Sequence, residues 1–564
     1  MKKIRFSLGG LAFGLILSVT VTTNCLHAAT FTVTTTNISG PGSLPVAISQ
    51  ANVTPGKNQI RIAVTNAIIL GLQLPAITNS VSITGIASVP SIISGGGTLP
   101  LFTFAAGTTN ILSNLVLANG NTIGNGAAIN NLGALSVLSC VVTNNRATNG
   151  FGGAIVNNGV MAICSSVIRG NQAEFGGGIY NIGALVIAQS TFITNCATGG
   201  VGQSGAGGGG GGGGFGGALF IYSGTVGITN STFFQNTSTG GRGGNVAGVN
   251  GGNGGGSTGG LGGLGYIYGS YASGTAGGAG GFGGGGGGGG EGDNPHGYFG
   301  GAGGSGGFGG GNGGSSAIRL GDAFFPGNGG SGFGGAIFIQ AGALFSVNCT
   351  ITVNSCVGGL GGLGSYTNGI QGQGCGGGVY NYGGNVTLLN TIVAGNVATN
   401  SSPDLSGNFL SSGYNLIGNN QGAAGLSVFD FQEMSADLGP LQNNGGSTPT
   451  CVPLPGSYAI GYGTSAGAPN TDQRGVPRPQ GGAFDVGAVQ VVTSSPIFIR
   501  PVVTSGSGFS LNTIFDATNS YRVQASTNLT NWTVLTNYGN GGTQTFIDLG
   551  TTNLSHRFYR TVTP

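Results

Sequence analysis

The sequence predicts an all-β protein whose main body is a right-handed parallel β-helix, a solenoid of stacked coils. Two observations lead to this prediction. Short apolar runs recur every 24 to 26 residues where nothing is inserted, and an asparagine stands at a fixed place in each repeat. Apolar residues alternate within the runs, as in Leu185–Ile187 and Thr191–Ile193, which indicates strands rather than helices. A period of this length with about three short strands is typical of one solenoid rung.

The recurring asparagine predicts a ladder along the solenoid axis. Equivalent residues of stacked rungs lie about 4.8 Å apart in parallel pairing, and stacked side-chain amides can hydrogen-bond to one another. Asparagine also tolerates the left-handed backbone of a tight turn, so we expect each of these residues to occupy such a turn. The predicted structural ladder consists of Asn119, Asn145, Asn171, Asn195, Asn236, Asn354 and Asn396.

A second motif, usually Phe-Gly-Gly-Ala/Gly followed by an apolar residue, precedes most repeats. Its copies are Phe151–Ile155, Phe175–Ile179, Phe215–Leu219, Phe333–Ile337 and Cys375–Val379. The glycines predict a turn at which a side chain would collide. Together the two motifs, over 125–398, resemble the repeats of the polymorphic outer-membrane protein family. The fold that this resemblance implies is the right-handed parallel β-helix, also called the pectin-lyase-like fold. This resemblance implies the β-helical passenger of a surface adhesin.

Composition excludes several classes of protein. The chain has 564 residues, of which 127 are glycine and only 5% are charged. Glycine does not recur at every third position throughout, which excludes collagen, and the low charge with 39% apolar residues excludes a charged disordered chain. Without the leader, 12 Lys and Arg balance 12 Asp and Glu. We therefore expect no nucleic-acid partner.

Residues 1–29 are predicted to be a signal peptide. Lys2, Lys3 and Arg5 precede the apolar run Leu8–Val21, and small residues end the segment at Ala29. An uncleaved N-terminal anchor is the alternative. No later run is long enough for a transmembrane helix. We expect an exported protein, extracellular or on the outer surface of a Gram-negative-type bacterium.

The remaining chain divides into four predicted parts. Residues 30–57 form an N-terminal cap with a short helix near Val46–Asn52, and 58–403 form the solenoid. Residues 404–490 resemble a choice-of-anchor Q domain, which implies an exported bacterial protein that is usually tethered to the surface. The motifs that carry this resemblance are Ser412–Gly418, Leu438–Leu441, Asn444–Gly446, Leu454–Ser457, Thr471–Gly475 and Asp485–Ala488.

Residues 498–564 are predicted to form a small β-sandwich that resembles fibronectin-type-III-like modules. Its single tryptophan, Trp532, is interpreted as a core residue, with sugar stacking as the alternative. Gly-rich insertions interrupt the solenoid at about 199–214 and 239–332. They are interpreted either as flexible loops or as an extended surface for adhesion or self-association. Contact points in the second interpretation are Tyr266, Tyr268, Tyr271, Tyr298 and Phe299.

Catalytic residues are scarce in the solenoid. Glycoside hydrolysis requires two carboxylates at a defined separation, yet from 51 to 403 the only acidic residues are Glu174, Glu291, Asp293 and Asp322. Glu174 is expected to form a surface ion pair with Arg146 or Arg169 on neighbouring rungs. We predict no catalytic, cofactor-binding or metal-binding residues and no cofactor. The charged cluster of the end region, interpreted as salt bridges that order a cap, contains Asp472, Arg474, Arg478 and Asp485.

The sequence therefore favours an adhesin-like or structural binding protein without catalysis. Its candidate partners are a polysaccharide or another cell-surface component, and its oligomeric state stays open. A polysaccharide lyase or hydrolase on a β-helix is one alternative. A matrix protein that associates through its Gly-rich loops is another. Seven cysteines follow the leader, and they are interpreted as small buried residues, with a Cys356–Cys375 bridge as the alternative.

Overall fold

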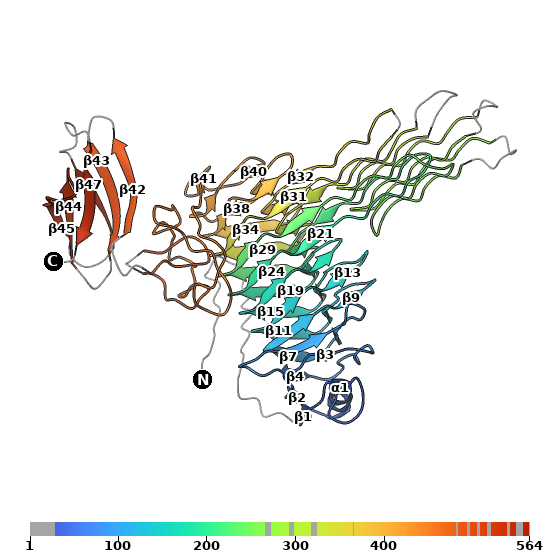
Figure 1. The fold of residues 1–564 in the computed structure, drawn as a ribbon, viewed down its shortest axis with the longest axis horizontal. Coiled ribbons are helices and arrows are strands. Elements are labelled where there is room, and N and C mark those ends of the chain that lie inside the picture. The colour runs from blue at the N-terminus through green and yellow to red at the C-terminus, as the bar shows by residue number, and fades with distance from the viewer. Residues whose placement is uncertain are drawn as a thin grey trace.

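A computed structural model describes residues 29–265, 272–292, 298–316, 324–364, 366–480, 483–492, 497–504, 508–515, 520–538, 542–548 and 556–562. Its main body is a parallel β-helix, so the predicted all-β solenoid is confirmed (Figure 1). The predicted leader lies almost entirely outside the described residues. No helix in the described ranges is long and apolar enough to cross a bilayer.

Equivalent strands of successive rungs stack in parallel into four main sheets, named A to D here, with a short fifth sheet, E. Sheet A contains β1 (Thr30–Val33), β2 (Asn58–Ile62), β4 (Val81–Thr84), β7 (Thr109–Ser113), β11 (Ala134–Leu138), β15 (Val160–Cys164), β19 (Ala184–Ala188), β24 (Thr225–Thr229), β29 (Ala343–Val347), β34 (Asn385–Leu389) and β38 (Leu410–Ser411). Sheet B contains β3 (Ile68–Ile69), β5 (Ser91–Ser94), β8 (Leu115–Ala118), β12 (Val141–Thr143), β16 (Val167–Arg169), β20 (Thr191–Ile193), β25 (Thr232–Phe234), β30 (Thr350–Thr352), β35 (Ile392–Val393), β39 (Leu416–Ile417) and β41 (Phe431–Gln432).

The other three sheets complete the rungs. Sheet C contains β6 (Phe102–Phe104), β10 (Ile129–Asn131), β14 (Ile155–Asn157), β18 (Ile179–Asn181), β23 (Leu219–Ile221), β28 (Ile337–Ile339), β33 (Val379–Asn381), β37 (Leu405–Asn408) and β40 (Ala423–Ala424). Sheet D contains β9 (Asn121–Thr122), β13 (Arg146–Ala147), β17 (Gln172–Ala173), β21 (Cys196–Thr198), β26 (Thr237–Thr239), β31 (Ser355–Val357) and β36 (Val397–Ala398). Sheet E contains β22 (Gly214–Phe215), β27 (Gly332–Phe333) and β32 (Gly374–Cys375).

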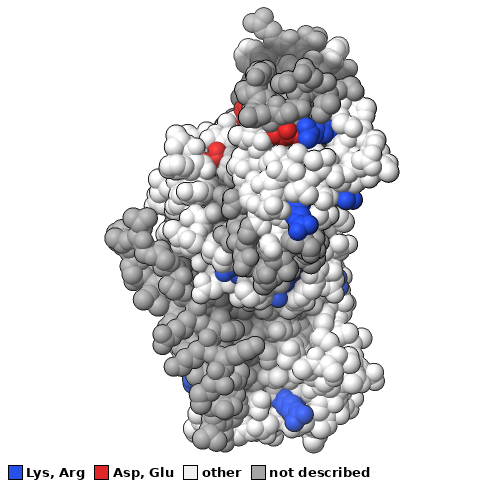
Figure 2. Space-filling view, turned by 90° about the vertical axis from the view of Figure 1, so that its left-hand side faces the viewer, with Lys and Arg blue, Asp and Glu red and all other residues white. Residues whose placement is uncertain are grey.

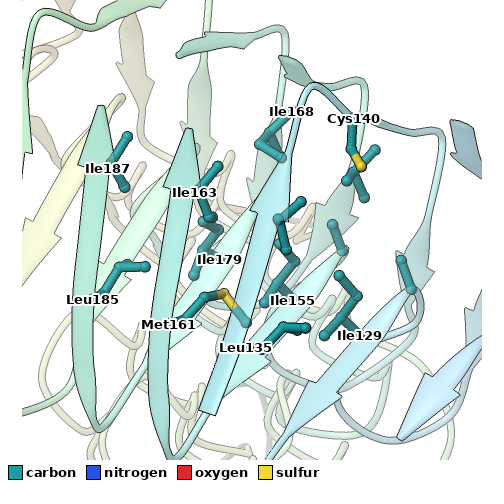
Figure 3. Packing of buried hydrophobic residues seen from close by; sticks show 14 of the residues in the cluster. Ile129, Leu135, Cys140, Ile155, Met161, Ile163, Ile168, Ile179, Leu185 and Ile187 are labelled. Atoms are coloured by element: carbon teal, nitrogen blue, oxygen red, sulfur yellow. The ribbon is translucent and has the colours of Figure 1, made fainter. Parts of the chain in front are cut away.

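Apolar side chains from sheets A, B and C fill the interior of the solenoid. Figure 3 shows Leu185 and Ile187 of β19 beside Met161 and Ile163 of β15, with Ile179 of β18 in the same interior. These side chains are at most 1% exposed. Burial of each one contributes about 1.5–3 kcal/mol relative to exposure. The alternation seen in the sequence therefore corresponds to one face of each strand pointing into the tube.

Six of the seven predicted ladder asparagines form a continuous chain of side-chain hydrogen bonds. In each pair the Nδ2 group donates to the Oδ1 atom of the next asparagine, at 2.8 to 3.0 Å. The members are Asn145, Asn171, Asn195, Asn236, Asn354 and Asn396. All six asparagines are buried. Each Nδ2 also donates to a backbone carbonyl of the preceding rung, so the buried amide is satisfied.

Asn119 lies outside this ladder, contrary to the prediction. The ladder position of its rung is Gly120, whose N–H donates to Asn145 Oδ1 at 2.7 Å. Asn119 pairs in register with Asn144, and both have positive φ, 52° and 54°. The left-handed residue is thus the one before each ladder asparagine, not the asparagine itself. Its counterparts in later rungs are Gly170, Thr194, Gln235, Val353 and Gly395.

Two aspartates end the polar ladders at the C-terminal end of the stack. Asp404 Oδ1 accepts from the backbone N–H and the Nδ2 of Asn396, at 3.0 and 2.7 Å. Asp430 Oδ1 accepts the same two bonds from Asn415, which belongs to a parallel line between sheets A and B. Burial raises the pKa of Asp404, and its N–H donors oppose that shift.

The solenoid is longer than the predicted range 58–403 at both ends. It begins with β1, inside the predicted cap, and continues to β41, inside the predicted end region. The N-terminal helix α1 (Leu44–Val53) buries Leu44, Ala47, Ile48 and Ala51 at the first rungs. It lies at the N-terminal end of the stack in Figure 1.

The remainder of the predicted end region folds back along the solenoid. Gln473 Nε2 donates to Thr191 Oγ1 at 2.8 Å, and its Oε1 accepts from Thr232. Asn348 and Asn390, two left-handed residues between sheets A and B, donate to the backbone of Asp485 and Thr464. The segment therefore covers a line of turns on several rungs rather than only the last coil.

The described segments of the Gly-rich insertions form a hydrogen-bonded bundle of extended segments, rather than flexible loops. Hydrogen bonds link each segment to a given neighbour at every third residue, which is the repeat of a polyproline II helix. Gly207, Gly210 and Gly213, for example, donate to Gly289, Gly286 and Gly283. Segments that leave sheet D at β21, β26 and β31 lie parallel to one another, so the rungs set the order of the bundle. In Figure 1 the bundle projects from one side of the solenoid.

Two all-glycine segments, 207–214 and 283–290, lie at the centre of this bundle. Each is hydrogen-bonded to six surrounding segments, three through its N–H groups and three through its carbonyl groups. A Cβ atom built at Gly210 would overlap the carbonyl oxygen of Gly311, and one at Gly286 would overlap that of Gly304. The two longest glycine runs of the insert are therefore required by close backbone packing.

The C-terminal module consists of two antiparallel three-stranded sheets. One contains β42 (Ile497–Thr504), β43 (Gly508–Phe515) and β46 (Gly542–Asp548), and the other contains β45 (Thr533–Tyr538), β44 (Tyr521–Ser526) and β47 (Phe558–Val562). Tyr521, Val523 and Phe546 form the buried hydrophobic cluster among its described side chains. Trp532 is half-buried and lies outside this core, so its interpretation as the core residue is wrong.

Candidate functional site

A groove at the junction of the solenoid and the glycine bundle is the candidate site. It has a volume of about 570 Å³, and we call it the junction groove. Its lining consists of Asn125, Asn130, Leu132, Phe151, Val156, Asn158, Phe175, Tyr180, Ile182, Phe220, Tyr222, Thr258, Phe282 and Gln340. None of these side chains carries a charge, and six of them are aromatic.

The floor of the groove belongs to two columns of stacked aromatic rings on the outer side of sheet C. In the first column, Tyr180 stacks on Phe220, with ring centroids 5.1 Å apart, and it also contacts Phe151 of the second column at 4.9 Å. In the second, Phe175 lies between Phe151 and Phe215, at 5.2 and 5.0 Å. The first residue of each Phe-Gly-Gly motif supplies the second column, because the motif recurs once per rung.

The glycine bundle supplies the opposite wall. Phe282 packs edge-on against Phe175, with centroids 6.3 Å apart, and Phe308 stacks on Phe282 at 5.3 Å. Thr258 donates to the carbonyl of Phe282 at 2.8 Å, which fixes the hydroxyl beside the groove. Residues far apart in the sequence thus meet because the rungs position the bundle beside sheet C.

The outer rim of the groove carries groups that are free to contact a ligand. Tyr222 is 45% exposed and stacks on Tyr180 at 5.9 Å. Gln340 Oε1 is buried and has no hydrogen-bond partner among the described residues. Buried polar atoms are normally satisfied, so an unpartnered acceptor at the groove indicates a place for a ligand or water donor.

The expected surface ion pair of Glu174 is not formed. Glu174 is 3% exposed, and its two carboxylate oxygens accept from the backbone N–H of Ser257, at 2.9 and 3.1 Å. Arg146 and Arg169 are exposed. Burial raises the pKa of Glu174, and the hydrogen bonds from Ser257 oppose that shift. Glu174 therefore holds the bundle against the solenoid.

Ionisable chemistry is sparse over the described part of the molecule. In Figure 2 most of the described residues on this face are uncharged, with isolated basic groups and few acidic ones. No group of three or more His, Cys, Asp or Glu in the described residues could hold a metal ion. Glu291 is half-buried in the glycine bundle, whereas Asp293 and Asp322 lie outside the described residues. The junction groove itself has no carboxylate in its lining.

The charged cluster of the end region forms buried contacts with the backbone. Asp472 and Arg474 form a salt bridge at 2.8 Å, and Asp472 is fully buried. Arg478 donates to the carbonyl groups of Asp485 and Gly487, at 3.1 and 2.8 Å. Burial raises the pKa of Asp485 to about 7, while the N–H groups of Val491 and Gly461 and the charge of Arg478 oppose the shift. These contacts order the segment that folds back on the solenoid.

All seven cysteines in the described residues are free thiols. Cys356 and Cys375 are therefore not joined, although one lies at each side of a Gly-rich segment. Burial raises the pKa of Cys140 to about 12 and that of Cys349 to about 11. Both thiols stay protonated near neutral pH and act as small apolar groups in the stack.

Only two of the five predicted contact residues of the insert are among the described residues. Tyr266, Tyr268 and Tyr271 lie outside the described residues. Tyr298 is half-buried and Phe299 is exposed, and neither lines the groove. The groove residues were missed, although the Phe-Gly-Gly repeat itself placed Phe151, Phe175 and Phe215 on one line.

A second asparagine ladder was also missed. Asn131, Asn157 and Asn181 in sheet C are linked by side-chain hydrogen bonds of 2.8 Å. They stand two residues after the apolar residue that ends each Gly-Gly motif, a signal present in the sequence. Comparison with models of known protein families gave no match, and comparison with curated proteins gave none.

Proposed function

We propose that this protein is an exported, surface-associated β-helix protein that binds a neutral polysaccharide in the junction groove without cleaving it. The observation that carries the proposal is the lining of the groove, in which aromatic rings lie beside amide side chains and no charge is present. Aromatic faces pack against the apolar faces of sugars while amides bond their hydroxyl groups. The resemblance to surface adhesins supports the proposed location.

The direction of the groove suits a linear polymer. Its lining comes from successive rungs, so related side chains recur along the solenoid axis. Asn158, Ile182, Tyr222 and Gln340 occupy one such line. Neighbouring sugar units of one chain would therefore meet similar surroundings.

The structure favours binding over the two alternatives. A hydrolase requires two carboxylates about 5–9.5 Å apart, and Glu174, the nearest acidic residue in sequence to the groove motifs, is buried against Ser257. A matrix built by extension of the glycine bundle requires free N–H groups at its edges. Asparagine side chains accept several of these bonds, as Asn253 does from Gly262 and Asn245 does from Leu363.

Binding of the mature chain to a panel of immobilised polysaccharides, measured by biolayer interferometry, tests the proposal. We expect a neutral polymer to bind. Tyr222→Ala should weaken its affinity at least about tenfold, which corresponds to a loss of about 1.4 kcal/mol of binding free energy. Tyr366→Ala is the matched control, because Tyr366 is exposed but does not line the groove. Equal losses in both variants, or shortening of the polymer during incubation, would refute the proposal.

A further inference from the structure

The C-terminal module carries a second surface whose chemistry differs from that of the junction groove. Trp532 is half-buried, and its indole Nε1 donates to the carbonyl of Leu529 at 3.1 Å, which fixes the ring. The guanidinium carbon of Arg560 lies 4.1 Å from the ring centroid. The module thus holds a tryptophan and an arginine together outside its core.

Strand pairing places further side chains on the same face of the sheet. Val534 and Arg560 lie opposite Gln524 on its two sides, and residues directly opposite share a face. Arg560 Nε donates to Gln524 Oε1 at 2.8 Å, which orients the guanidinium. Side chains two residues apart on a strand share a face. Arg522, two residues before Gln524, and Phe558, two residues before Arg560, therefore lie on this face as well. We call these residues the tryptophan face.

The charge of the tryptophan face is uncompensated. Arg522 and Arg560 form no ion pair with a carboxylate in the described part of the chain, whereas Arg557 pairs with Asp548 at 3.2 Å. The segment 497–564 contains four arginines and only two aspartates. A cationic face with a fixed aromatic ring complements a ligand that combines negative charge with flat apolar surface.

We propose that the tryptophan face binds an acidic polysaccharide, one whose sugar units carry carboxylate groups. Arg522 and Arg560 would pair with carboxylates, and Trp532 would pack against a sugar ring. A nucleic acid is the less suitable polyanion, because the chain after the leader has equal numbers of basic and acidic residues and nucleic-acid binding depends on a broad basic surface. This site is independent of the junction groove.

Binding of the full mature chain to polygalacturonate, with its fully methyl-esterified form as the neutral control, tests this inference. In the Tyr222→Ala variant, whose junction groove is impaired, we expect polygalacturonate to bind more tightly than its esterified form. In the parent, Arg560→Gln, Arg522→Gln and Trp532→Ala should each weaken polygalacturonate binding about tenfold or more. Arg560→Lys should restore part of the affinity. Tyr222→Ala and Arg146→Gln, the latter an exposed arginine on the solenoid, should leave it unchanged.

Three results would overturn the inference: equal binding of the two polymers to Tyr222→Ala, equal loss in Arg146→Gln, or single-stranded DNA bound as tightly as polygalacturonate. Thermal unfolding of each variant, unchanged from that of the parent, shows that the module stays folded. Because the groove variant is included, failure of this proposal is distinguishable from failure of the proposed neutral-glycan site.

Discussion

The carboxylate of Glu174 and the backbone N–H of Ser257 join the two halves of the junction groove. Glu174 belongs to the solenoid and Ser257 to the glycine bundle, and they are 83 residues apart in the sequence. Both oxygens of the carboxylate accept from this one N–H group, at 2.9 and 3.1 Å. Thr258, the next residue, lines the groove. One buried acidic residue therefore adds a direct hydrogen-bonded link between the two groove walls, beside the aromatic contact of Phe175 with Phe282.

Removal of this contact should loosen the wall. Glu174→Ala leaves the Ser257 N–H without its acceptor, and because Ser257 is exposed, we expect only the net value of one hydrogen bond to be lost, about 0.5–1.5 kcal/mol. We expect faster hydrogen exchange in 254–260 and weaker glycan binding, while exchange in β19 stays unchanged. Glu174→Gln retains one oxygen acceptor, so its exchange rate in 254–260 and its glycan affinity should lie between those of Glu174→Ala and the parent. Unchanged exchange in 254–260 of Glu174→Ala would contradict this role.

The stability of the fold should decrease as pH rises from about 4 to about 8. Burial raises the pKa of Glu174, Asp404 and Asp485, the last to about 7, above the value of about 4 in unfolded chains. The folded state then binds more protons in this window, so stability is greatest below the unfolded pKa and is lost as pH rises through the folded pKa. Thermal unfolding across the window measures the slope.

The variant Asp485→Asn isolates one contribution to that slope. It removes the group whose pKa is raised to about 7, so the difference in Tm between pH 5 and pH 8 should become smaller. The absolute Tm should also fall, because the amide NH₂ faces one of the two N–H donors, from Gly461 or Val491. A slope equal to that of the parent would show that Asp485 titrates alike in both states.

Interruption of the main asparagine ladder should be strongly destabilising. In Asn195→Ala, the backbone N–H and Nδ2 of Asn171 both lose their acceptor, and Asn236 Oδ1 loses a donor. With about 1–3 kcal/mol for each unsatisfied buried group, we expect a loss of at least about 3 kcal/mol in denaturant unfolding. Asn144→Gly is the control, since Asn144 is exposed with φ of 54°, which glycine adopts freely. Similar losses in both variants would exclude a special role for the ladder.

A single methyl group at the centre of the glycine bundle should disorder it. The Cβ of Gly210→Ala would overlap the Gly311 carbonyl oxygen, so neighbouring segments must separate and lose backbone hydrogen bonds. Limited proteolysis should then cut within 240–330 at a rate at least about ten times that of the parent, since loss of 1.4 kcal/mol raises the open population by that factor. In Gly124→Ala the new Cβ meets only Thr122 Oγ1, at 3.5 Å, and the cutting rate should not change.

The solenoid was predictable because its signal repeats once per rung. Asn145 and Asn171 are spaced by one rung and hydrogen-bond to each other, as their spacing indicated. The assignment of Asn119 failed by one residue, because Asn144 and Asn145 are adjacent and either could set the phase. Only the strand register, in which Thr109 pairs with Ala134, places Gly120 on the ladder.

The glycine bundle and the groove were not predicted for a different reason. Ordering glycine costs more conformational entropy than ordering any other residue, which favours a flexible-loop interpretation of a Gly-rich insertion, and side-chain patterns carry no information where side chains are missing. The compensating bonds join backbones far apart in the sequence, such as Gly210 to Gly286. The available signal was the three-residue spacing of Leu261 and Leu264, which are both exposed on the bundle. This spacing matches the repeat of a polyproline II helix.

The two terminal aspartates give the solenoid a definite stopping point. An amide donates and accepts, so a coil that ended in asparagine would offer hydrogen bonds to another molecule stacked against it. The carboxylates of Asp404 and Asp430 only accept, and their second oxygens are already bonded to the N–H groups of Asn419 and Ser427. These two carboxylates therefore present no free donor or acceptor oxygen with which the ladder could continue into a further coil.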